Sequence, residues 1–251
     1  MVDLAHVDYD SDGPAPPLLI AHGLFGSARN WNVIARRLSD RGPVRAVDMR
    51  NHGDSPREKI HDYDALADDL AGAMEPGWDV LGHSMGGKAA MVLALRQPER
   101  VRRLVVADIA PVAYGHSHAH LVRAMQALDL AAIDTRRDAD AALAAHVDTP
   151  AVRSFLLQSL DVKGKRWLLN LDVLGREMGA ISGWPDTRGS YGAPALFLSG
   201  GNSDYVTRDM HDAIRTLFPK ARFAAIPGAD HWLHAARPRE FVAAVRAFLD
   251  A

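Results

Sequence analysis

The chain has 251 residues, 48% of them hydrophobic, which is enough to bury one large core. Its formal net charge of −2 gives no reason to expect nucleic acid or an anionic membrane as a partner, so a small-molecule substrate is favoured. The absence of cysteine excludes disulfides, thiolate zinc sites and cysteine nucleophiles. No stretch has the roughly 18 consecutive apolar residues that span a bilayer, and residues 1–13 do not resemble a secretion signal. We therefore expect a cytoplasmic protein without a membrane span.

Short apolar runs alternate with longer helical patterns along most of the chain. This alternation is typical of an α/β fold in which helices cover both faces of a mostly parallel sheet. The pattern predicts strands within 2–9 and at 17–21, 43–48, 78–82, 102–107, 194–199 and 222–226. It predicts helices at 28–40, 63–74, 85–97, 207–217 and 238–249.

Residues 112–190 interrupt this alternation, because they contain no convincing core strand. Apolar residues recur there at spacings of three and four, as in helices that pack on one face. Such patterns occupy 121–130, 138–147 and 151–160. We expect a helical cap inserted into a core formed by 1–111 and 191–251, with cap and core making one structural unit.

The stretch VLGHSMGGKAAM at 80–91 fits two motifs. The G-x-x-x-x-G-K spacing is that of a phosphate-binding loop, but Ala89 follows Lys88 where such loops carry a magnesium-binding Ser or Thr. The G-x-S-x-G spacing fits a nucleophile elbow, in which a serine occupies a strained turn between a strand and a helix. We favour the elbow, with Ser84 as nucleophile.

A serine nucleophile needs a base and a carboxylate, and in this kind of fold they follow in the order serine, acid, histidine. Of the 12 histidines, His231 lies in the loop after the last predicted strand, where the base belongs. His22, His83 and His234 are less suitably placed. Asp108 and Asp204 each follow a strand, and position alone favours Asp204 as the acid.

Two backbone amides are needed to stabilise an oxyanion. Met85 directly follows the nucleophile and supplies the first. The second is expected from the loop after the first main strand, at Leu24 or, as the alternative, Phe25.

Several motifs together resemble the esterase and acyl-CoA thioesterase branch of the α/β-hydrolase superfamily. They are AHGLFGSARNW, VDMRNHGDSP, GHSMGGKAAM, ADIAPVAY, LFLSGGNSDYV and GADHWLHAARP, and they cover nearly the whole core. The resemblance implies an α/β-hydrolase fold and hydrolysis of carboxylic esters, often with short acyl chains, sometimes of acyl thioesters, without a cofactor. It also implies that the aspartate of the D-I-A-P motif, Asp108, is the acid, and on this ground we choose it over Asp204.

Other interpretations stay open within the fold, namely a perhydrolase, a C–C bond hydrolase or an acyltransferase. A non-catalytic ligand-binding protein is the alternative from another class. We expect no metal site at His116, His118 and His120, since no Glu completes a zinc motif. Residues 48–53 are expected to form a structural loop under the site. Five aromatic residues are candidates for lining an acyl pocket: Phe25, Tyr114, Trp184, Tyr205 and Trp232.

Overall fold

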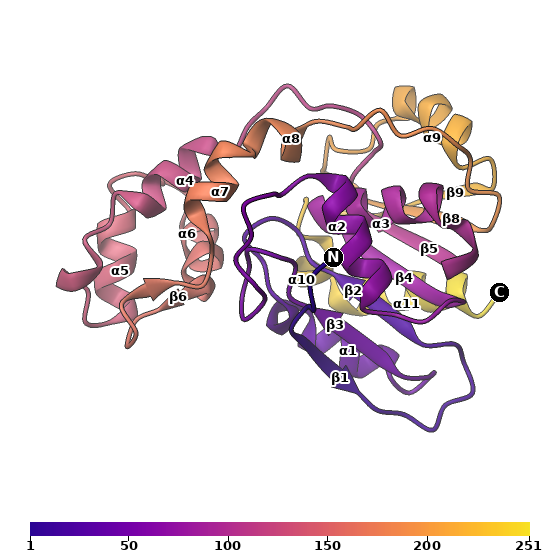
Figure 1. The fold of residues 1–251 in the computed structure, drawn as a ribbon, viewed down its shortest axis with the longest axis horizontal. Coiled ribbons are helices and arrows are strands. Elements are labelled where there is room, and N and C mark those ends of the chain that lie inside the picture. Colours follow the sequence, from indigo (N-terminus) through magenta and orange to yellow (C-terminus); the bar gives the residue numbers. More distant parts are fainter.

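The computed structural model describes all of residues 1–251 and confirms the α/β architecture. One seven-stranded sheet has the order β1-β3-β2-β4-β5-β8-β9, and every neighbouring pair is parallel except β1 with β3 (Figure 1). Its strands are β1 (His6–Tyr9), β2 (Leu18–Ala21), β3 (Val44–Val47), β4 (Trp78–His83), β5 (Val101–Ala107), β8 (Ala195–Gly200) and β9 (Ala221–Ile226). Each predicted core strand is present, and β1 lies within 2–9 as expected.

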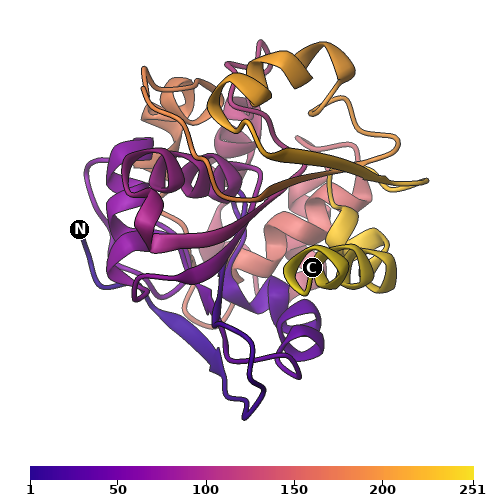
Figure 2. The ribbon, with the colours of Figure 1, turned by 90° about the vertical axis from the view of Figure 1, so that its right-hand side faces the viewer.

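Helices cover both faces of the sheet, because successive side chains of each strand point to opposite faces. On β2, Leu19 packs in the cluster that contains the helices of one face, and Leu18 and Ile20 pack in the cluster of the other. The first face carries α2 (Tyr63–Gly72), α3 (Met85–Arg96) and α9 (His211–Leu217). The second carries α1 (Asn32–Leu38), α10 (Leu233–Ala236) and α11 (Pro238–Leu249). Figure 2 shows α11 across the sheet from α2 and α3.

The five predicted core helices are all present, with small differences at their ends. The helices expected from 28 and 207 begin as 3-10 turns, η1 (Ala28–Trp31) and η5 (Arg208–Met210), before α1 and α9. A third turn, η2 (Pro98–Arg100), precedes β5, and the four-residue α10 was not predicted. A helix that short cannot show a helical repeat in the sequence.

The segment between β5 and β8 lies to one side of the sheet and adds no strand to it (Figure 1). The three predicted helical segments overlap α4 (Ala119–Gln126), α5 (Arg136–Leu143) and α6 (Pro150–Leu156). The segment also contains η3 (Leu130–Ala132), η4 (Leu157–Ser159), α7 (Leu171–Arg176), α8 (Met178–Ser182) and a hairpin of β6 (Leu160–Asp161) with β7 (Arg166–Trp167). We propose 112–190 as the limits of this insert. No helix of the chain has the length and apolar character needed to cross a membrane.

Candidate active site

Ser84 lies on the turn between β4 and α3, with a backbone conformation that is strained for any residue except glycine. Its φ is +51° and its ψ is −119°. The turn is possible because its two flanking glycines lack side chains. A Cβ on Gly82 would lie 2.3 Å from the carbonyl oxygen of Gly86, and a Cβ on Gly86 would lie 2.4 Å from that of His22. The strand, the two glycines and the helix therefore lift Ser84 above the end of the sheet.

His231 and Asp108 form a hydrogen-bonded pair, although 123 residues separate them in the chain. The Nδ1 of His231 lies 2.8 Å from Oδ2 of Asp108, and the carboxylate is completely buried. The Gly200 amide donates to the other carboxylate oxygen at 2.9 Å, and the Ser203 hydroxyl donates to Oδ2. The Asp108 carboxylate is thus held by three donors. Asp204 is exposed and makes no hydrogen bond or ion pair with this group.

The imidazole of His231 is positioned by two further residues whose roles the sequence did not indicate. Tyr205 stacks on it, with ring centres 3.9 Å apart and planes 21° apart. His83 donates from Nε2 to the carbonyl oxygen of His231 at 2.9 Å, so it holds the backbone of the loop. The rival base His234 points elsewhere, because its ring stacks on Trp31 at 4.2 Å. Burial lowers the pKa of His234 to about 3.

The loop after β2 brings an unpaired amide next to the elbow. The Leu24 N–H forms no hydrogen bond within the protein, and the Met85 N–H, at the first position of α3, has no partner within its helix. The Phe25 N–H is already engaged, since it donates to Nε2 of His52 at 3.2 Å. Among the three candidate amides, those of Leu24 and Met85 therefore remain available to a ligand.

Two buried histidines hold this loop from below. His22 donates from Nδ1 to the Gly23 carbonyl at 2.8 Å and accepts the Met49 amide on Nε2 at 2.9 Å. His52 donates from Nδ1 to the Arg50 carbonyl at 2.9 Å while its Nε2 accepts the Phe25 amide. Burial lowers the pKa of His22 to about 4 and that of His52 to about 3, so both imidazoles are neutral.

Residues 48–53 form a buried loop beneath this site, consistent with the structural role expected for them. Asp48 accepts the Ala28 amide at 2.7 Å and the Asp54 amide at 2.9 Å, which ties three loops together. Arg50 makes a bidentate ion pair with Asp69 of α2 at 2.5 and 2.8 Å. These charged groups support the neighbouring turns and do not line either cavity described below.

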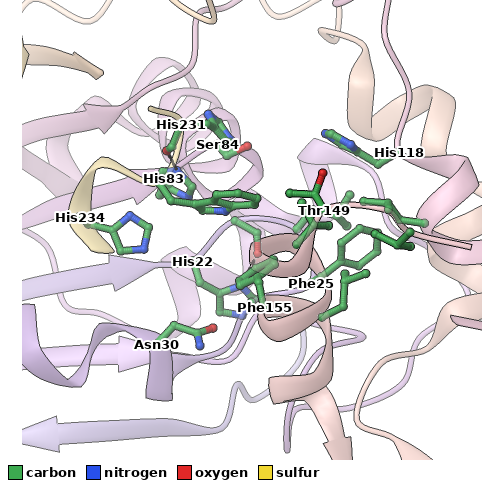
Figure 3. A pocket seen from close by; sticks show the side chains of 18 of the residues that line it. His22, Phe25, Asn30, His83, Ser84, His118, Thr149, Phe155, His231 and His234 are labelled. Carbon is green, nitrogen blue, oxygen red and sulfur yellow. Dashed lines mark hydrogen bonds between the residues drawn. The ribbon is translucent and has the colours of Figure 1, made fainter. Parts of the chain in front are cut away.

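Two cavities meet at Ser84. The larger, of about 450 Å³, lies between the sheet and the insert. In Figure 3, Ser84 and His231 border it from the core, and His118, Thr149 and Phe155 border it from the insert. The smaller, of about 30 Å³, is lined by Met85, Ile109 and Ile181 among others. Of the five aromatic candidates, Phe25 and Trp232 line the larger cavity, Tyr114 and Tyr205 line the smaller, and Trp184 lines neither.

Lys88, one turn after Ser84 on α3, is almost completely buried and lines the smaller cavity. Its ammonium donates to the carbonyl oxygens of Ser182 and Gly183, where the insert returns to the core. It also lies 4.8 Å from the centre of the Tyr114 ring. Burial lowers its pKa to about 7. Lys88 therefore joins the elbow helix to the end of the insert, a contact that the sequence did not reveal.

The histidines at 116, 118 and 120 do not all face one point, because only the first two share a neighbour, the Tyr205 hydroxyl. His116 lies 2.8 Å from the Tyr205 hydroxyl, and His118 lies 3.4 Å from it. His120 lines the larger cavity. No group of three or more His, Asp or Glu side chains in the chain is arranged to hold a metal ion.

Comparisons with known proteins agree with this geometry. A family model described as alpha/beta hydrolase fold matches residues 16–238. The sn-1-specific diacylglycerol lipase ABHD11 of Mus musculus is 41% identical over 254 residues, covering 96% of this chain and 83% of its own length. Esterase YbfF of Escherichia coli is 39% identical over 239 residues and 93% of each chain. A solved marine microorganism esterase has a TM-score of 0.92 at 35% identity, over 99% of this chain and 100% of its own. The chain therefore belongs to the esterase branch of the alpha/beta hydrolase superfamily.

Proposed function

We propose that this carboxylesterase-type hydrolase cleaves carboxylic esters with short acyl chains through an acyl-enzyme on Ser84. In this proposal His231 is the general base, Asp108 orients it, and the amides of Leu24 and Met85 bind the oxyanion. The observation that carries the proposal is the strained Ser84 turn beside a His231–Asp108 pair only 2.8 Å apart. Of the two available amides, that of Leu24 lies on the loop after β2 and that of Met85 begins α3, directly after Ser84.

The acylation half of the reaction begins when His231 Nε2 takes the proton from the Ser84 hydroxyl. The oxygen then attacks the ester carbonyl carbon, and the carbonyl oxygen becomes an oxyanion bound by the Leu24 and Met85 amides. When the carbonyl re-forms, the bond to the alcohol oxygen breaks, and His231 gives its proton to that oxygen. The buried Asp108 carboxylate stabilises the imidazolium in between.

Deacylation repeats these steps with water in place of the serine. His231 takes a proton from water as the water oxygen attacks the acyl carbon. The bond to the Ser84 oxygen then breaks, and the proton on His231 returns to Ser84. The products are the carboxylic acid and the free enzyme. The same steps would hydrolyse an acyl thioester, with the thiol leaving in place of the alcohol, so activity toward acyl-CoA is the second part of this proposal.

The matched substitutions Asp108→Asn and Asp204→Asn separate the two candidate acids. With p-nitrophenyl acetate, we expect kcat/KM to fall about 10⁴-fold in Asp108→Asn, which loses the carboxylate that orients His231, and in Ser84→Ala, which loses the nucleophile. Asp204→Asn should stay within about twofold of the parent, since Asp204 is exposed and makes no hydrogen bond or ion pair with Asp108 or His231. Full activity of Asp108→Asn would remove it from the mechanism.

A covalent probe separates catalysis from ligand binding on the same fold. A fluorophosphonate should label Ser84 in the parent protein and fail to label it in Ser84→Ala, because only an activated serine attacks phosphorus. A panel of acyl-CoA substrates, assayed beside the p-nitrophenyl esters, would then measure the thioesterase activity. A protein that binds esters without labelling at Ser84 would be a binding protein.

A further inference from the structure

Ser84 lies where two cavities of very different size meet, and an ester has an acyl part and an alcohol part on either side of the bond that is cleaved. The larger cavity measures about 450 Å³ and the smaller about 30 Å³. The two share only Leu24, Ser84 and His118 among their lining residues. An ester bound with its carbonyl carbon at Ser84 can therefore place its acyl part in one cavity and its alcohol part in the other.

The position of His231 decides which side enters which cavity. His231 must protonate the leaving alcohol oxygen, so that oxygen lies within hydrogen-bond reach of its Nε2. His231 and its neighbour Trp232 line the larger cavity, and neither lines the smaller one. The alcohol part of the ester thus extends into the larger cavity.

The acyl chain takes the remaining direction at the carbonyl carbon. The carbonyl oxygen points to the amides of Leu24 and Met85, and the leaving oxygen points to His231. The third substituent takes the remaining direction, toward the smaller cavity, which Met85 and Ile109 line and from which the stacked ring of Tyr205 separates His231. Since about one water-sized sphere needs roughly 10–15 Å³, a cavity of about 30 Å³ accepts one or two carbon atoms.

The walls of the smaller cavity suit an alkyl group because three of their polar groups already have partners. The Tyr63 hydroxyl donates to the Ile181 carbonyl, and the Tyr114 hydroxyl donates to the Tyr205 carbonyl at 2.7 Å. The Lys88 ammonium is held by the two carbonyls at the end of the insert. The side chains of Ile109 and Ile181 complete an apolar surface.

We propose that the smaller cavity is the acyl subsite and the larger cavity the alcohol subsite, so that the substrates are acetate or propionate esters of bulky, mainly apolar alcohols. This inference rests on the proposed acyl-enzyme mechanism. It names Ile181 of α8 as the residue that limits acyl length. It also names the side chains of α6, such as Val152 and Phe155, as those that contact the alcohol.

The test is a grid of esters that varies the acyl chain and the alcohol independently. The acyl series is acetate, propionate, butyrate and hexanoate, and the alcohols are ethanol, p-nitrophenol and 1-naphthol. We expect Ile181→Ala to raise the butyrate-to-acetate ratio of kcat/KM by about tenfold or more, because it vacates the space of three carbons. Ile181→Val, a milder change, should shift the ratio in the same direction by less.

The matched control is Val152→Ala, an aliphatic truncation in the larger cavity. It should leave the butyrate-to-acetate ratio within about twofold of the parent and change the naphthyl-to-ethyl ratio instead. The reverse pattern, in which Ile181→Ala alters alcohol preference and Val152→Ala alters acyl preference, would overturn the assignment. A parent enzyme that prefers hexanoate over acetate would also overturn it. So would a preference for hemisuccinate esters that Lys88→Met abolishes, because the smaller cavity would then bind the acyl carboxylate through Lys88 instead of an alkyl group.

Fluorophosphonate labelling of Ser84 in every variant keeps this test apart from the proposed function. Variants that label normally but show unshifted acyl ratios would contradict the subsite assignment alone. Absence of labelling in the parent protein would contradict the mechanism itself. Thermal melts of Ile181→Ala and Ile181→Val show whether each variant is folded, and the milder variant carries the test if the larger truncation unfolds the insert.

Discussion

Mild acid is expected to destabilise this protein from beneath the active site, at His22 and His52. Each ring accepts a backbone amide on Nε2, from Met49 and Phe25 respectively, so a proton there would place two donors face to face. Their folded pKa values of about 4 and about 3 lie below the usual 6.5. Between pH 6.5 and those values the unfolded chain binds more protons than the folded one, so stability falls as pH falls.

The magnitude follows from these pKa values. Going from pH 7 to pH 5 should cost about 2 kcal/mol for each histidine and about 4 kcal/mol for both. That is a large share of the 5–15 kcal/mol that usually separates the folded and unfolded states of a domain. The loss is specific to buried neutral histidines, because an exposed one has nearly the same pKa in both states.

Urea unfolding followed by circular dichroism at pH 7 and pH 5 measures this loss. His52→Gln should be less stable than the parent at pH 7, but it should lose about 2 kcal/mol less on going to pH 5. The control is His146→Gln, which removes an exposed histidine of the insert and should keep the parent's pH dependence. If His52→Gln lost as much stability as the parent on acidification, His52 would not be a buried neutral group.

Three further substitutions test other parts of the site. Gly86→Ala would put a Cβ 2.4 Å from the His22 carbonyl oxygen, so we expect at least about a 100-fold loss of kcat and a lower melting temperature. Ser203→Ala removes one donor from the Asp108 carboxylate and should lower kcat for p-nitrophenyl acetate about tenfold with KM unchanged; an unchanged kcat would contradict this. Lys88 has a folded pKa of about 7, so the unfolded chain holds its proton to higher pH and stability should rise with pH above 7. Urea midpoints at pH 7.5 and 9.5 should show that Lys88→Met lacks this rise, of up to about 1.4 kcal/mol per pH unit.

Much of the core could be predicted because its elements carry simple patterns. The run before Ser84 is short and apolar, and the residues after it have helical spacing. Gly82 and Gly86, each two residues from Ser84, are typical of a tight turn between that strand and that helix. The same patterns located β5 and β9, and hence the loops on which Asp108 and His231 lie. Periodicity failed for α7 and α8, because helices of six and five residues are too short to show a repeat.

The choice between Asp108 and Asp204 as the acid depends on a three-dimensional contact that the sequence pattern does not show. Position alone favoured Asp204, and only the similarity of the D-I-A-P motif pointed to Asp108. The structure brings Asp108 to His231 and leaves Asp204 exposed, because the turn after β5 directs the Asp108 carboxylate toward the loop after β9. No sequence pattern signals such a contact between residues 123 apart.

Ser203 and Lys88 were missed for the same reason. Ser203 contacts Asp108 across 95 residues, and Lys88 contacts the Gly183 carbonyl across the same separation. The serine had a signal in the GGNS motif, but its partner could not be named from the sequence. Lys88 had only its place in a glycine-rich stretch, which is equally compatible with an exposed helix residue.

The central claim, an acyl-enzyme on Ser84, is tested most directly by trapping that intermediate. Rapid acid quenching during turnover of p-nitrophenyl acetate, followed by peptide mass spectrometry, should find an acetyl group on Ser84 at a level that rises and then decays. Ser84→Ala should carry no acetyl group at this peptide and should release p-nitrophenol about 10⁴-fold less efficiently than the parent. Steady ester turnover without acetylation of Ser84, or with the acetyl group on another residue, would contradict the proposed mechanism.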